Sequence, residues 1–92
     1  MKCHLLKVWP HLFDEIATGR KTFDLRSTAD RCFQAGDLVT FTAWDPVTGR
    51  EVMGQPPISR SILAVYANVP GLLPGHVALS LGLRSYPESP GN

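Results

Sequence analysis

The sequence has little of several things, and each shortage narrows what the protein can be. Its 92 residues hold only two cysteines, Cys3 and Cys32, and neither lies in the CxxC spacing that marks strong zinc sites. We therefore expect free, buried thiols and no metal. No apolar run is long enough to span a bilayer, and His4 and Lys7 interrupt the N-terminal apolar stretch. These absences favour a cytoplasmic protein that does not enter a membrane.

Net charge is also small, at +1, so the chain as a whole does not have the basic excess of many nucleic-acid binders. The excess that exists is local, because four basic and two acidic residues fall between Arg20 and Arg31. Such a cluster is either a solvated face or part of a site. The sequence has no Gly-rich phosphate loop, nucleophile elbow or local Cys–His signature, and we expect no cofactor.

What is present reads as short strands with one early helix. A proline at position 10 and a glycine at position 19 bracket the helix. We predict the helix at 10–18 and strands at 3–8, 22–26, 38–44, 50–53, 58–66 and 76–83. The expected fold class is α+β: one domain over residues 1–84, a small closed or nearly closed β-barrel of five or six strands with the helix capping one end. Residues 85–92 are expected to form a mobile tail.

The segment GRKTFDLR, residues 19–26, concentrates charge between the predicted helix and the second strand. Its second half alternates, so Phe23 and Leu25 share one face of the strand while Thr22, Asp24 and Arg26 share the other. We expect the apolar pair to face the core. The strand would then carry an acid, a base and a hydroxyl on its exposed face, which is typical of a site.

The order of several motifs resembles a known family. The stretch HLLKVWPHLFDEIATGRKTFDLR, residues 4–26, is similar to the opening of ASCH-type domains and most similar to the small bacterial and phage ASCH/PUA-like family DUF3850. The later segments DRCFQAGDLV, WDPVTGREVMG and LLPGHVALSLGL resemble that family's following blocks in the same order.

This resemblance implies a PUA-like β-barrel with a cleft beside the first helix, and binding of RNA or of a modified nucleotide. One ASCH-type enzyme group hydrolyses the acyl group of N4-acetylcytidine without a metal. Its motif has Thr where Asp24 stands here, beside the same lysine, Lys21, and it uses a glutamate from later in the chain. This sequence has no matching later acid, so an amidohydrolase would have to use Lys21 and Asp24.

Eight residues are candidates for ligand contact. In a binding module, Lys21, Arg26 and Arg31 would contact phosphate and Asp24 a base edge. The candidates are Lys7, Trp9, Arg20, Lys21, Thr22, Asp24, Arg26 and Arg31.

Each candidate also has a structural interpretation. Asp24 and Arg26 can simply pair with each other, and Lys21 can complement the C-terminus of the helix. Lys7 beside Trp9 can hold a stacked base, or Trp9 can anchor the start of the helix.

Two further residues look purely structural in the sequence. We predict that His4, at the start of the first strand, is a satisfied structural histidine. We also predict that Asp37, after Gly36, is a turn residue.

Three functions remain open on these grounds. The first is a module that binds single-stranded RNA or a modified nucleoside or nucleotide, as a monomer or weak homodimer. The second is a small amidohydrolase acting on an N4-acylated cytidine or a related nucleoside. The third is a protein-interaction domain.

Overall fold

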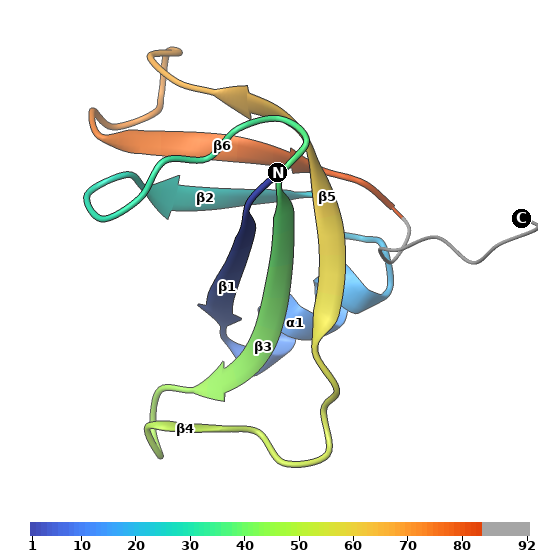
Figure 1. Ribbon diagram of the computed structural model, residues 1–92. Helices are drawn as coiled ribbons and strands as arrows, with labels where there is room; N and C mark the ends of the chain where they lie inside the picture. Colours follow the sequence, from blue (N-terminus) through green and yellow to red (C-terminus); the bar gives the residue numbers. More distant parts are fainter. Residues whose placement is uncertain (84–92) are drawn as a thin grey trace, which may run out of the picture.

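The fold is one short helix packed against a curled sheet, in a computed structural model that describes residues 1–83 (Figure 1). The tail predicted at 85–92 lies outside the described residues. In chain order the elements are β1 (Cys3–Val8), α1 (Pro10–Ala17), β2 (Phe23–Ser27), β3 (Leu38–Asp45), β4 (Arg50–Glu51), β5 (Ile58–Tyr66) and β6 (His76–Leu81). The α+β class and the six strands agree with the sequence prediction.

The sheet is mixed, with the strand order β1-β3-β5-β6-β2 and with β4 added on β3. The β1–β3 pair is parallel and the other pairs are antiparallel. A parallel pair needs a crossover connection, and here α1 and β2 both lie between β1 and β3 along the chain. The strand order ends at β1 on one side and β2 on the other, and these two do not pair within residues 1–83. The expected closure into a barrel by strand pairing is therefore not seen.

Strand β5 turns the sheet. Residues 58–61 of β5 pair with β3, residues 62–66 pair with β6, and the register shifts between Ile62 and Ala64. A bulge of this kind bends its strand and increases the local twist. In Figure 1 the long β5 ribbon accordingly links the β1–β3 part of the sheet to the β6–β2 part.

The core fills the inside of this curl. Helix α1 starts at Pro10, whose missing N–H costs nothing in the first turn, and it is followed by Gly19 with a φ of 79°. Its buried residues pack with the inner residues of the strands and with the loop that precedes β3. The core consists of Leu6, Val8, Phe13, Ile16, Phe33, Val39, Phe41, Ala43, Ile62, Val77, Leu79 and Leu81.

Strand β2 has the opposite orientation to the one predicted. Asp24 is buried, at 5% exposure, whereas Phe23 and Leu25 are 50% and 57% exposed. The alternation of apolar and polar residues correctly predicted which side chains of β2 share a face, but it does not indicate which of the two faces is buried. The inner side of β2 meets main-chain carbonyl groups and charged partners, so the polar side chains are the ones that point inward.

Candidate functional site

The two unpaired sheet ends are bridged by arginine side chains. Nη2 of Arg26, on β2, donates to the carbonyl oxygen of Lys7, on β1, at 3.1 Å. Nη1 of Arg31, in the loop after β2, approaches the carbonyl oxygen of Leu5 at 3.5 Å. Guanidinium groups thus take the place of a backbone ladder between β1 and β2, and they bring positive charge to this opening.

Behind the opening lies a cluster of three charged side chains from GRKTFDLR. Nζ of Lys21 is 3.0 Å from Oδ1 of Asp24, and Nε of Arg26 donates to Oδ2 of the same carboxylate. Lys21 also donates to the carbonyl oxygen of Phe23. The pairing of Asp24 with Arg26, which was the structural alternative to ligand contact, is observed, and Lys21 joins it. Both carboxylate oxygens are engaged, and the three formal charges leave a net +1.

A second buried carboxylate belongs to Asp37, which the sequence presented as a turn residue. Its Oδ2 accepts from Nε2 of His4 at 2.9 Å and from the main-chain N–H of Gln34 at 3.1 Å, and its Oδ1 accepts from the N–H of Lys2 at 3.1 Å. The hydrogen bond from His4 is the main reason that the pKa of Asp37 falls from 3.8 to about 2, while burial opposes the change. The imidazole of His4 also packs on Phe33, with ring centres 4.6 Å apart.

The predicted structural role of His4 agrees with these contacts. The sequence indicates that His4 is buried, because alternation along β1 places it on the same face as the inward residues Leu6 and Val8. Asp37 gave no such signal, since Gly-Asp is also an ordinary turn sequence.

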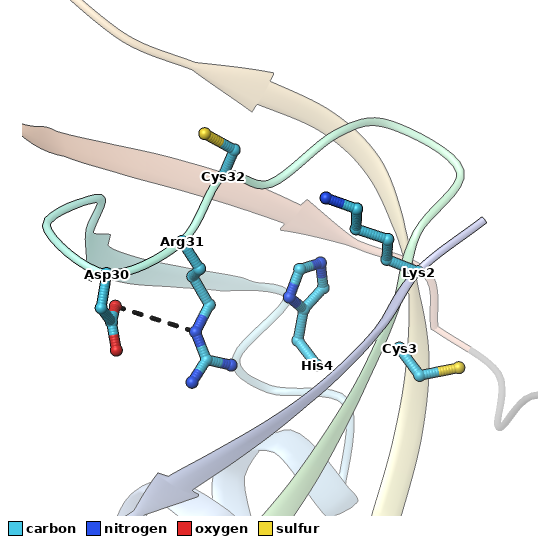
Figure 2. Close-up of a pocket in the computed structure, with 6 residues that line it drawn as sticks. All are labelled: Lys2, Cys3, His4, Asp30, Arg31 and Cys32. Carbon is cyan, nitrogen blue, oxygen red and sulfur yellow. Dashed lines mark ion pairs between the residues drawn. The ribbon is translucent and has the colours of Figure 1, made fainter.

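Two cavities lie beside these clusters and share the loop residues Asp30 and Arg31. The larger, of about 520 Å³, is lined by Lys2, Cys3, His4, Asp30, Arg31 and Cys32. Figure 2 shows these residues, with the thiol of Cys3 turned away from the others. The smaller, of about 180 Å³, is lined by Leu6, Arg26, Ser27, Asp30, Arg31 and Phe33. Lys2, Arg26 and Arg31 give the combined lining three cations against the single carboxylate of Asp30, so the space favours an anion.

Arg31 is held in this region by long contacts alone. Its Nε is 3.8 Å from Oδ1 of Asp30, a carboxylate whose side chain is 77% exposed. Its contact to Leu5 is at the outer limit of a hydrogen bond. Both contacts are weak enough to be exchanged for a ligand. Arg31 lines both cavities.

The other predicted residues lie elsewhere. Nζ of Lys7 lies 3.9 Å from the ring centre of Trp44, on the outer face of β1 and β3, so Lys7 pairs with Trp44 and not with Trp9. Trp9 occupies the N-cap of α1, is 54% exposed and has His11 as its ring neighbour. Arg20 is exposed and Thr22 half-buried.

The cysteines and the helix C-terminus also differ from expectation. Cys3 and Cys32 are free as predicted, but both are exposed, so the expectation of buried thiols is wrong.

A buried arginine that the sequence analysis did not single out, Arg60, donates to the carbonyl oxygen of Ile16 in the last turn of α1. Burial lowers the pKa of Arg60. The sequence indicates that Arg60 is buried only through its alternation with Ile58 and Ile62, which lie on the same face of β5.

The reversed orientation of β2 leaves apolar side chains on its outer face. Phe23 and Leu25 are exposed there, and an apolar groove lies between Leu25, Gly71, Leu72, Leu73 and His76. Tyr66, opposite Ala78 in the register of β5 and β6, is also exposed. This face differs from the cavities in having almost no charge.

Two kinds of feature are absent from residues 1–83. No helix in residues 1–83 has the length and apolar content needed to cross a membrane. In the same part of the chain, no three His, Cys, Asp or Glu side chains are grouped so that they could hold a metal ion.

Comparison with known proteins gives one match. The family model described as "Domain of unknown function (DUF3850)" covers residues 3–81, which is nearly all of the described chain. No curated protein matches the sequence.

Proposed function

The chain belongs to the DUF3850 family, and from the geometry of its site we propose that it is a module that binds single-stranded RNA or a modified nucleotide. The ligand would occupy the two cavities at the β1–β2 opening. The observation that carries this proposal is Arg31, a cation with only long contacts that borders both cavities. Arg31 would contact phosphate directly. The charges of Arg26 and Lys21 would add positive electrostatic potential at the ligand.

Asp24 takes a supporting part in this proposal. Its two oxygens are already engaged by Lys21 and Arg26, so we assign it the role of holding Arg26 in place across the opening. Contact with a base edge would fall to main-chain groups and to Ser27, which lines the smaller cavity.

We further propose that the curled sheet is of the PUA-like (ASCH) type. The order of motifs in residues 4–83 supports this, as do the curl of the sheet at β5 and the position of α1 behind β1 and β3 (Figure 1). Two free, exposed thiols fit a reducing compartment, and we propose a cytoplasmic location.

Binding can be tested with a short, fluorescently labelled single-stranded RNA at low salt. Arg31→Ala is expected to weaken binding about tenfold and to reduce the slope of log K against log salt by about one, because one phosphate contact is lost. Arg50→Ala is the matched control, since Arg50 is an exposed arginine on β4, outside both cavities. Equal affinities for Arg31→Ala and the wild type would contradict the assignment.

An amidohydrolase remains the second candidate, because Lys21 and Asp24 are in contact at 3.0 Å. Against it, the two side chains are only 11% and 7% exposed, and neither lines the cavities beside Arg31. A general base needs access to a water molecule. Incubation with N4-acetylcytidine decides the matter: conversion that is lost in Lys21→Ala would establish the enzyme, and no conversion would remove it.

A further inference from the structure

His4 is held in a single tautomer when it is neutral. Asp37 is ionised at neutral pH, because its pKa is about 2, and a carboxylate can only accept hydrogen bonds. The hydrogen between Nε2 and Oδ2 of Asp37 therefore belongs to His4. It follows that Nδ1 of the neutral ring carries a lone pair and no hydrogen.

Nδ1 is open to the larger cavity. Within the described part of the chain, no buried side-chain nitrogen or oxygen lacks a hydrogen-bond partner. Nδ1 of His4 has no such partner among these residues, so it must be reached by solvent, and His4 lines the cavity of about 520 Å³. In Figure 2 the ring stands between the first strand and the loop that carries Arg31 and Cys32. A buried, oriented imidazole thus presents one free nitrogen to an open, polar hollow of the surface.

The other groups facing this nitrogen are predominantly positive. Lys2 comes from the start of the chain and Arg31 from the loop. The only carboxylate of the lining, Asp30, is mostly exposed and lies next to Arg31. Cys32 is an exposed thiol, the Cys3 side chain points away from the ring (Figure 2), and Asp37 is engaged by Nε2 on the other side of the ring. An anion that can also share a proton with Nδ1 would pair with both cations and with the open nitrogen of His4.

We propose that this cavity is a subsite for a phosphate monoester, the terminal phosphate of a nucleotide or of an RNA end. Lys2 and Arg31 pair with its charges, and one proton lies between Nδ1 of His4 and a phosphate oxygen. This proposal rests on the proposed nucleotide-binding function and names the group that the site recognises.

The proton distinguishes a monoester from an internal diester. A phosphate monoester loses its second proton at a pKa of about 6, so near neutral pH the ligand itself can supply the proton of a hydrogen bond to Nδ1. A diester has no second proton to supply and carries one charge less. Facing an unprotonated Nδ1, its oxygens would meet a lone pair, which is unfavourable.

The first test compares ligands on the full-length wild-type chain by calorimetry. The series consists of a nucleoside 5′-monophosphate, its methyl ester, the nucleoside and inorganic phosphate. The monophosphate is expected to bind about tenfold or more tightly than the methyl ester, as one charge-assisted hydrogen bond implies. Inorganic phosphate separates recognition of the phosphate alone from recognition of the nucleotide. Equal affinity for monoester and methyl ester would overturn the proposal.

The second test reads the proton directly, because charge alone also favours the monoester. The ¹⁵N spectrum of the His4 ring should show Nδ1 moving toward the protonated position on addition of the monophosphate, while Nε2 keeps its hydrogen. His4→Gln should lose the preference for the monoester, and Arg50→Ala should retain it. An Nδ1 signal unchanged at saturating monophosphate would overturn the proposal even if His4→Gln failed to fold.

The outcomes separate this inference from the function on which it rests. Binding of 5′-hydroxyl RNA that depends on Arg31, with no gain from a 5′-phosphate, would leave the RNA-binding function standing and remove the monoester subsite. Protonation of Nδ1 by the monophosphate without any affinity for RNA would leave the monoester subsite standing and remove the RNA-binding function.

Discussion

Asp24 and Asp37 are both buried carboxylates, yet their surroundings give them different roles. The partners of Asp24 are two cations, Lys21 and Arg26, and the cluster has its hydrogen bonds satisfied internally. The partners of Asp37 are two main-chain N–H groups and Nε2 of His4. The other ring nitrogen of His4, Nδ1, is open to the larger cavity. Charge density in the sequence drew attention to Asp24. Both clusters reach a cavity, that of Asp24 through Arg26 and that of Asp37 through His4, but His4 has a ring nitrogen without a hydrogen-bond partner among residues 1–83.

The largest effect is expected from Asp37→Ala. This change leaves the N–H groups of Lys2 and Gln34 and the ring of His4 without an acceptor, and main-chain groups cannot turn toward water. We expect unfolding free energy to fall by about 3 kcal/mol at neutral pH, measured by urea denaturation.

The control for Asp37→Ala is Asp45→Ala, which removes an acceptor from two N–H groups in the turn before β4. That turn is exposed, so we expect a loss of about 1 kcal/mol. Equal losses at the two positions would show that burial of Asp37 does not matter.

Asp24→Ala is expected to cost less, between about 2 and 3 kcal/mol. It leaves the half-buried cations Lys21 and Arg26 without their carboxylate, but both charges sit on long side chains whose heads can move toward solvent. The same denaturation measurement checks this. A loss well above that of Asp37→Ala would reverse the comparison between the two clusters.

The pH dependence of stability sharpens the comparison at Asp37. Its pKa is lowered on folding from 3.8 to about 2, so the unfolded state binds the proton first as pH falls. The stabilisation, about 2 kcal/mol, is fully present above pH 4 and is lost as pH falls toward 2. The difference in unfolding free energy between the wild type and Asp37→Asn should shrink over this interval. A constant difference would contradict the lowered pKa.

The sequence predicted most of the elements because their signals are local. β1 and β5 begin and end where alternation and β-branched residues predict, and α1 lies between the expected proline and glycine. β6 ends at Leu81, two residues early, and β4 is shorter than expected. Strand boundaries such as these depend on pairing partners, which a single sequence does not reveal.

The site was only partly predictable for the same reason. Lys21, Asp24 and Arg26 come together because they lie within one strand and its approach, so spacing alone brings them into contact. The pair of His4 and Asp37 joins residues 33 positions apart, and it depends on the parallel pairing of β1 with β3. The orientation of β2 was predicted wrongly because an apolar face was assumed to be an inner face.

An amide NMR titration with a short 5′-phosphorylated single-stranded RNA would show directly where the RNA binds. We expect shifts at Lys2 to His4 and at Asp30 to Cys32, with smaller ones at Arg26, and none on the outer face of β2. Shifts confined to Phe23, Leu25 and the groove beside Leu73, or no shifts at all, would contradict this expectation and would redirect attention to the apolar face and a protein partner.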